Sequence, residues 1–303
     1  IELVKKGSQP SGIPTHGPVA QREIVFGGLE PSTAYEVYIR TVCSPSSISS
    51  WNVAIPFTTV LEMPTNCQIN LPLKDNGTET FLLEVPQTGI LGVDIFIKGI
   101  DLIIEHDWPA DLRVILVSPN GQQLVLSNHN GTAQDDFGIP GDTTCLGVTR
   151  FAPGACRQLK ESTPPYLGTF RPDGDVEAWR PDTLNGNYWK LVFFDRALKD
   201  IGKLRYANIE FSTQKCLTPV NFVLTGADAN ELSVSWDVPA ATCNTVRLSI
   251  TKTDGTIQEV FVECSEKQYT FFGLEPNTDY ILNITGICSD FSQSQESCSI
   301  LAT

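Results

Sequence analysis

The sequence predicts an all-β protein of three modules in series, and three observations lead to this fold class. One motif near the start of the chain is repeated near its end. Between the two copies lie short apolar runs separated by turn residues, which is typical of sandwiches and jelly rolls. No segment of useful length has helical periodicity. We therefore expect a partial sandwich over residues 1–60, a jelly roll over 61–214 and a complete sandwich over 215–303.

The repeat has the same order of features in both copies. Residues 26–44 read FGGLEPSTAYEVYIRTVCS, and residues 271–289 read FFGLEPNTDYILNITGICS. Each copy has a turn of the pattern Gly-Leu-x-Pro-x-Thr and then an alternating strand that begins at Tyr35 or Tyr280. In the second copy an upstream strand places Trp236 on the core face. The wide spacing excludes a solenoid, so the copies are two domains that flank a different one.

Residues 215–303 resemble a fibronectin type III domain. Leu274, Pro276 and Tyr280 match the turn and the corner tyrosine of that family, and Trp236 matches the tryptophan of its second strand. The resemblance implies a complete β-sandwich for this part of the chain.

The first copy of the repeat lacks the two strands that open the second copy. With the repeats aligned, Ile1 falls opposite Val246, at the start of the third strand, so strands A and B are absent from residues 1–60. Half a sandwich would expose its own core. We expect the two strands to come from polypeptide outside these residues, with donation by another chain as the alternative.

The middle module has its own set of expected strands, at residues 81–85, 92–97, 100–105, 112–118, 123–127, 189–195 and 202–211. A hairpin turn is expected at Asn120-Gly121. Five segments, 100–106, 111–121, 168–174, 184–192 and 200–204, resemble the P/Homo B domain. That domain stands beside the catalytic unit of subtilisin-like proprotein convertases. It also occurs in secreted bacterial proteins that have no protease, and the module series resembles large surface proteins of Bacteroidetes-type bacteria.

The charge of the chain excludes several partners. The net charge is −14, which disfavours nucleic acid because phosphate binding needs patches of Lys and Arg. The same charge disfavours an anionic membrane surface, and no apolar run is long enough to span a membrane. No signal peptide opens the sequence, so we expect any export signal to have been removed or to lie upstream. A soluble extracellular or cell-surface protein is the expected class.

The cysteines predict disulfide bonds and an oxidising compartment. The chain has nine cysteines, no CxxC pair and three scattered histidines, which disfavours a zinc site. The expected pairs are Cys145–Cys156 within one loop and Cys67–Cys216 between the middle module and the last one. The resemblance to a type III domain, which gathers its cysteines at one pole, implies Cys243–Cys264 and Cys288–Cys298. Cys216–Cys288 is an alternative that would leave Cys67 to pair elsewhere. Cys43 is left over, as expected if its partner lies with the missing strands, although an intermolecular bond is also open.

Acidic loops of the middle module are candidates for calcium binding. Ca²⁺ takes six to eight oxygen ligands from such loops, and resemblance to P domains, some of which bind calcium, supports a site. We expect Asp111, Asp136 and Asp142 as ligands, with Asp135 in reserve. The family's acidic loop is altered here, however, and solvated acidic loops are an equal alternative.

The sequence predicts no catalytic centre. His16, His106 and His129 have no neighbouring nucleophile motif, so we expect three exposed loop histidines and no enzyme. Trp108 and Trp179 are candidates for a ligand surface, against the alternative that both pack as loop residues.

These observations predict a non-catalytic structural and adhesive segment of a large extracellular modular protein, calcium-stabilised in its middle module. The expected partners are neighbouring domains of the same long chain, other copies in a filament or appendage, and other surface proteins or a target-cell surface. The first alternative is an accessory C-terminal region of a secreted subtilisin-like protease or other hydrolase. The second is a carbohydrate-binding module.

Overall fold

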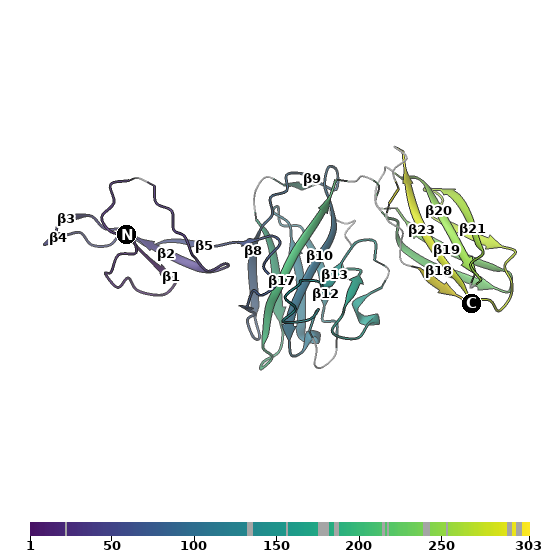
Figure 1. Ribbon diagram of the computed structural model, residues 1–303, viewed down its shortest axis with the longest axis horizontal. Helices are drawn as coiled ribbons and strands as arrows, with labels where there is room; N and C mark the ends of the chain where they lie inside the picture. Colours follow the sequence, from purple (N-terminus) through teal and green to yellow (C-terminus); the bar gives the residue numbers. More distant parts are fainter. Residues whose placement is uncertain are drawn as a thin grey trace. The chain divides into compact units, whose positions relative to one another are not determined.

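The computed structural model describes residues 1–303 except 22, 132–135, 156, 175–181, 185–187, 214–215, 217, 239–242, 253, 290–292 and 295–298. Its regular structure is almost entirely strand, so the all-β prediction is confirmed. The two helical segments described are single 3₁₀ turns, η1 (Pro109–Asp111) and η2 (Leu159–Glu161). Neither these turns nor any other described helix is long and apolar enough to cross a membrane. Figure 1 shows the strands gathered in three groups along the chain.

The middle module is a jelly roll of two five-stranded sheets. The first sheet has the order β14 (Gly168–Phe170), β13 (Thr149–Phe151), β10 (Phe96–His106), β17 (Gly202–Ser212), β7 (Leu71–Pro72). The second has the order β12 (Gln123–Asn128), β11 (Leu112–Val117), β16 (Trp189–Asp195), β8 (Thr78–Glu84), β6 (Leu61–Glu62). A separate two-stranded pair joins β9 (Gly89–Leu91) to β15 (Asp182–Leu184). Trp189 is buried in β16, as its strand pattern predicts.

Strand β10 is the centre of this module. The sequence predicts two strands over residues 92–105, but the structure has one long strand with a bulge between Ile97 and Gly99 in its pairing with β17. Glycine is common at such bulges. The strand is buried along nearly its whole length. Beside its C-terminal end, Ile104 and Phe137 exchange two backbone hydrogen bonds of 2.8 Å.

The C-terminal module is a complete sandwich. One sheet has the order β18 (Val220–Asp228), β19 (Glu231–Asp237), β22 (Gln268–Phe272). The other has the order β21 (Ile257–Glu263), β20 (Cys243–Lys252), β23 (Tyr280–Cys288), β24 (Ile300–Ala302). Alternate residues of both sheets fill the core, and Trp236 of β19 is buried there as predicted. The Tyr280 hydroxyl accepts a hydrogen bond of 2.9 Å from the Glu275 backbone N–H, which fixes the turn before β23.

The N-terminal module contains one three-stranded sheet, β1 (Glu2–Lys5), β2 (Ala34–Tyr38), β5 (Ile55–Thr58), and the hairpin of β3 (Val42–Ser44) and β4 (Ser47–Ile48). Residues Ile1–Glu62, with Phe81–Glu84, form one compact unit, whose last strands, β6 and β8, are also part of the second sheet of the jelly roll. The Tyr35 hydroxyl accepts a hydrogen bond from the Glu30 N–H at 3.1 Å, the contact that Tyr280 makes in the C-terminal sandwich.

The register of β1 corrects the alignment of the two repeats. Lys5 lies opposite Tyr35, whereas Lys252 lies opposite Tyr280, so Lys5 corresponds to Lys252. The two lysines also make the same ion pair, each to the glutamate of the following turn, at 2.7 and 2.6 Å. Ile1 therefore takes the place of Leu248, not of Val246. The sequence alignment missed this shift because the connection between the two strands is longer in the N-terminal module.

The disulfide bonds differ from three of the expected pairs. The structure joins Cys67 to Cys145, Cys216 to Cys288 and Cys243 to Cys264. The expected Cys145–Cys156, Cys67–Cys216 and Cys288–Cys298 bonds are therefore wrong, while Cys216–Cys288 was the alternative and Cys243–Cys264 was expected. Cys156 and Cys298 lie outside the described residues. Cys43 is free and exposed.

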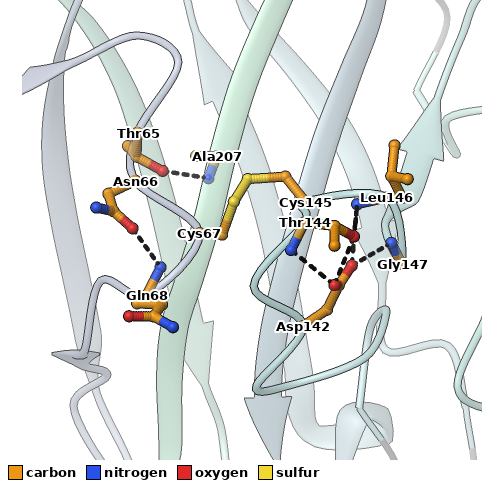
Figure 2. The surroundings of a disulfide bond; sticks show 10 residues. All are labelled: Thr65, Asn66, Cys67, Gln68, Asp142, Thr144, Cys145, Leu146, Gly147 and Ala207. Carbon is orange, nitrogen blue, oxygen red and sulfur yellow. Dashed lines mark hydrogen bonds between the residues drawn. A yellow bond between two sulfur atoms is a disulfide. The ribbon is translucent and has the colours of Figure 1, made fainter.

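The folding of the jelly roll explains the Cys67–Cys145 bond. Thr65 fixes the segment of Cys67 to β17, because its backbone N–H and hydroxyl oxygen bind the backbone of Ala207 at 3.0 and 2.9 Å. The loop that carries Cys145 follows the Phe137 segment, which is bound to β10, the neighbour of β17. The two cysteines thus meet across one sheet, with Cα atoms 5.3 Å apart (Figure 2).

Candidate functional site

One end of the jelly roll carries a group of titratable side chains at the ends of neighbouring strands. Strands β10 and β16 end there, and η1, β11 and β17 begin there. His106 is the register partner of Gly202, and Asp195 is the partner of Leu112. Neighbouring strands of a sheet therefore bring these ends into contact. We use the name acidic pole for His106, Asp111, Asp195, Arg196 and Asp200.

His106 is the buried centre of the acidic pole, not the exposed loop residue that the sequence predicts. It is 2 % exposed. Its Nδ1 accepts a hydrogen bond of 3.1 Å from the Trp108 N–H, so the neutral ring carries its proton on Nε2. That Nε2 lies 3.6 Å from Asp195 Oδ2, which is too long for a hydrogen bond. The sequence missed the burial because residues that pack against His106, such as Gly202, are distant along the chain.

The carboxylates of the acidic pole bind loop groups. Asp195 accepts a hydrogen bond from the Ala197 N–H at 2.9 Å, and Asp111 accepts one from Arg196 Nε at 2.9 Å. Burial raises the pKa of Asp200, and the negative charges of Asp111 and Asp195 raise it further. Raised carboxyl pKa values occur at active sites and also in structural networks. The pole has a histidine beside a carboxylate but no serine or cysteine nucleophile among its residues.

The structure does not bring the expected calcium ligands together. The described residues contain no group of three or more His, Cys, Asp or Glu side chains placed to hold a metal ion. Asp111 is bound to Arg196, and Asp136 accepts a hydrogen bond from the His106 N–H at 2.8 Å. Asp135 lies outside the described residues. Among the described residues, Asp111, Asp136 and Asp142 thus do not form one group of this kind, and calcium binding stays a prediction.

Asp142 has a structural role in the loop of Cys145. Its two oxygens accept hydrogen bonds from the backbone N–H groups of Thr144, Leu146 and Gly147 and from the Thr144 hydroxyl, at 2.6–2.9 Å (Figure 2). These hydrogen bonds, first that of the Thr144 side chain, lower the pKa of Asp142 to about 2. A carboxylate with so many protein donors has little capacity left for a cation.

The remaining candidates are scattered. Trp108 is 44 % exposed at the start of η1, whereas Trp179 lies outside the described residues. His129 is partly buried, and burial and the charge of Arg196 lower its pKa. His16 packs its ring against Phe26 in the N-terminal module.

A substitution of Gly202 tests how closely side chains are packed around His106 in the acidic pole. A Cβ at this position would overlap Cδ2 of His106 and lie 2.9 Å from Cδ1 of Leu73. We expect Gly202→Ala to lower the free energy of unfolding by about 1–3 kcal/mol, the usual cost of overpacking a core. Urea unfolding measures the change. Gly226→Ala is the control, because its Cβ would meet atoms no closer than 3.6 Å. Equal effects of the two substitutions would contradict the close packing of His106.

Comparison with known proteins identifies two parts of the chain. Residues 217–300 match the family model of the fibronectin type III domain, and residues 99–144 match that of the proprotein convertase P-domain. No curated protein matches the chain. Three similar solved structures each cover 29 % of this chain. The first is described as a myokine structure, with 26 % sequence identity, a TM-score of 0.28 and 97 % of that chain covered. The second is the FN5 domain of Drosophila Lar, with 15 % identity, a TM-score of 0.26 and 94 % of that chain covered. The third is the fn3 domain of human contactin 1, with 19 % identity, a TM-score of 0.27 and 79 % of that chain covered.

Proposed function

We propose that this chain, which carries segments matching a proprotein convertase P-domain and a fibronectin type III domain, is a structural and adhesive segment of a large extracellular surface protein. The observation that carries the proposal is the combination itself. Both matched domain types are non-catalytic, and they follow one another in a single chain. Fibronectin type III domains, P-domains and disulfide bonds are typical of extracellular proteins.

The positions of the disulfides suit a protein that bears tension. Cys216 precedes β18 and Cys288 ends β23, so their bond joins residues 72 positions apart and encloses every strand of the C-terminal sandwich except β24. A force applied at the ends of this module cannot extend the enclosed residues while the bond is intact. At about 3.5 Å per extended residue, the bond withholds about 250 Å of chain length.

Single-molecule force spectroscopy of the 303-residue chain tests this role. Without reductant, we expect the C-terminal sandwich to release only a short length on unfolding. In dithiothreitol the release should grow by about 250 Å for this module. Without reductant, the Cys216→Ser/Cys288→Ser variant should already show a long release, shorter than in dithiothreitol by the about 75 Å that the Cys243–Cys264 bond withholds. A long release from the oxidised native chain would contradict the proposal.

Adhesion is tested separately, with beads that carry the chain. We expect coated beads to cluster with one another or to bind the surface of cells that display the parent protein, more than beads coated with an unrelated protein of equal negative charge. Equal binding by the two kinds of bead would remove adhesion from the proposal.

A second candidate function is that of accessory region to a secreted subtilisin-like protease. The match of residues 99–144 favours it, because P-domains occur beside such proteases. A fluorophosphonate probe, which labels active serine hydrolases, should be applied to the parent protein from its native source. Labelling of that polypeptide would replace the structural proposal, and its absence beside a labelled subtilisin control would support it.

A carbohydrate-binding role rests on the exposed Trp108 alone. Aromatic rings on a module surface can stack on sugars, but one ring is a weak basis. A glycan array with the native chain and Trp108→Ala tests it. Binding that is lost in the variant would support this role, and absence of binding would remove it.

Calcium stabilisation of the jelly roll is a further proposal, based on the resemblance alone, since the described carboxylates already bind protein donors. We expect calorimetry to show a higher unfolding temperature of this module in 1 mM calcium than in EDTA, because a ligand of the folded state stabilises it. Asp136→Asn should remove the shift and Asp142→Asn should keep it. Equal unfolding temperatures in calcium and EDTA would contradict the proposal.

A further inference from the structure

The sheet of the N-terminal module has one apolar face that no described strand covers. We use the name open face for the side chains of Leu3, Tyr35, Val37, Ile39, Ile55 and Phe57. Leu3 lies opposite Val37, and Val37 lies opposite Ile55, so the three form a row across the sheet. Ile39 is 43 % exposed and Ile55 is 50 % exposed, whereas Leu3, Val37 and Phe57 are half-buried and Tyr35 is buried. A partly exposed apolar face of this kind is unusual on a finished sandwich.

The C-terminal sandwich shows what covers the equivalent face. In the register set by the two lysines and two tyrosines, Leu3, Val37 and Ile39 correspond to Ile250, Leu282 and Ile284. Those three residues lie in the hydrophobic core, and Ile284 is fully buried. Core residues of β18 and β19 cover them, namely Phe222, Leu232, Val234 and Trp236. The face is therefore of a kind that a pair of strands buries.

Residues 23–27, which correspond to β22, also indicate that a strand pair is missing from the N-terminal module. In the C-terminal sandwich Phe271 of β22 lies opposite Leu232 of β19 and is fully buried. Its counterpart Phe26 is only partly buried, and residues 23–27 form no strand. Neighbouring Val25 is 87 % exposed. A strand needs a hydrogen-bonded partner, and the described part of the module supplies no counterpart of β19 for this segment.

The free cysteine points independently to the same missing element. Cys43 corresponds in the repeat to Cys288, which is buried and bonded to Cys216. Cys216 stands four residues ahead of Val220, where β18 begins. The partner that the repeat assigns to Cys43 would thus come just before the first missing strand. The open face and the free thiol of Cys43 therefore both indicate the same segment, the counterpart of β18 and β19 with a cysteine ahead of it.

We propose that the open face is completed by an antiparallel strand pair of the β18–β19 type, and that a cysteine about four residues ahead of its first strand forms a disulfide with Cys43. The inner positions of the pair carry alternating large apolar side chains. In the C-terminal sandwich β18 and β19 come directly before β20, the counterpart of β1. The pair we commit to is therefore joined by its C-terminal end to Ile1, not donated by another chain. This inference is independent of the proposed adhesive role.

The disulfide step needs an oxidant of the disulfide class, such as oxidised glutathione. The two thiols lose two protons and two electrons, one S–S bond forms between the cysteines, and the S–S bond of glutathione is reduced to two thiols. No other bond changes. Thus the reaction can be run on the purified chain in a glutathione buffer.

The test extends the 303-residue chain at Ile1 with a copy of residues 216–247, because Ile1 takes the place of Leu248. The copy carries Cys243→Ser, since the N-terminal module has Val19 rather than cysteine near the place of Cys264. A matched control extension keeps the leading cysteine but carries Leu232→Ser, Val234→Ser and Trp236→Ser. Both chains are refolded in glutathione buffer. Alkylation of Cys43, mapped by peptide mass spectrometry, and amide exchange of residues 23–27 and 35–39 are then measured.

We expect the native extension to block alkylation of Cys43 until a reductant is added, and to slow exchange of these amides by at least about tenfold. The control extension should leave both readouts as in the parent chain. Leu3→Asp, on the open face, should cancel the effect of the native extension, whereas Val4→Asp, on the other face, should preserve it. Equal alkylation and exchange with the two extensions would overturn the proposal.

A free peptide of residues 216–238 guards against an extension that fails to fold. Added to the parent chain in glutathione buffer, it should form a mixed disulfide at Cys43 faster than a peptide with the three serine substitutions. Equal rates would overturn the proposed complementarity. Full protection of Cys43 from alkylation by the free peptide, at a concentration equal to that of the chain, would show that the pair needs no covalent link. That result would overturn the proposed connection to Ile1.

Discussion

Replacing both Cys67 and Cys145 by serine is expected to lower the free energy of unfolding of the jelly roll by about 4.5 kcal/mol. The bond joins residues separated by 78 positions, and the chain-entropy relation gives this value for a loop of that length at 25 °C. Calorimetry of the intact chain measures the loss as a fall in the unfolding temperature of one module, while the C-terminal sandwich keeps its own transition.

The Cys243→Ser/Cys264→Ser variant is the matched control. Cys243 and Cys264 are 21 positions apart in the sequence, and the same relation gives about 3 kcal/mol for a loop of that length. This loss of stability should appear in the unfolding transition of the C-terminal sandwich. A smaller loss for the longer loop would contradict the entropic account. A loss in the C-terminal transition from the Cys67 and Cys145 change would contradict the assignment of that bond to the jelly roll.

The sequence could predict the fold because the patterns that indicate strands and turns depend on residues close together in the chain. Period-2 alternation and turn residues depend on neighbours in the chain, so they give Trp189 and Trp236 as core residues, and both are buried. The repeat was detected from one turn and one strand. It could not give the register of β1, because register depends on the length of the loop that returns to β2.

The candidate site was predicted less well because its contacts are not local. His106 has a polar sequence neighbourhood, and its surroundings include residues distant along the chain, namely Asp136 and Gly202. Asp142 resembled a calcium ligand by composition, but the turn of its own loop supplies its hydrogen-bond donors. Cysteine spacing cannot give pairs that form across a sheet, as Cys67 and Cys145 do.

Arg150→Met is expected to lower the free energy of unfolding of the jelly roll by about 2–3 kcal/mol. The guanidinium donates to both oxygens of Asp101 at 2.8 and 2.9 Å and to Glu210, and so links β13, β10 and β17. Gly99 leaves the space in which it lies. Removing one partner of a buried ion pair costs about 3–5 kcal/mol. The smaller value applies here because the Arg150 side chain is 23 % exposed.

A second substitution separates the loss of attraction from the burial of an unpaired charge. Asp101 is itself buried, so in Arg150→Met its carboxylate would stay in the sheet without a counter-charge. We expect Asp101→Leu combined with Arg150→Met to recover more than half of the loss, because an apolar pair of similar volume can replace an ion pair. Lys98→Met, which removes the exposed pair with Glu210, should cost less than about 1 kcal/mol.

The pH dependence of the Arg150→Met effect identifies its electrostatic part. Burial raises the pKa of Glu210, but the hydrogen bonds from Lys98 and Arg150 outweigh it and leave that pKa below the ordinary value of 4.5. A carboxyl with a lowered pKa stabilises the fold fully above its unfolded pKa and loses this effect as the pH falls through the folded value. The difference between native chain and Arg150→Met should therefore be full at pH 7 and shrink below pH 4.5. A difference that stays constant as Glu210 is protonated would mean that the pair between Arg150 and Glu210 does not contribute to the effect.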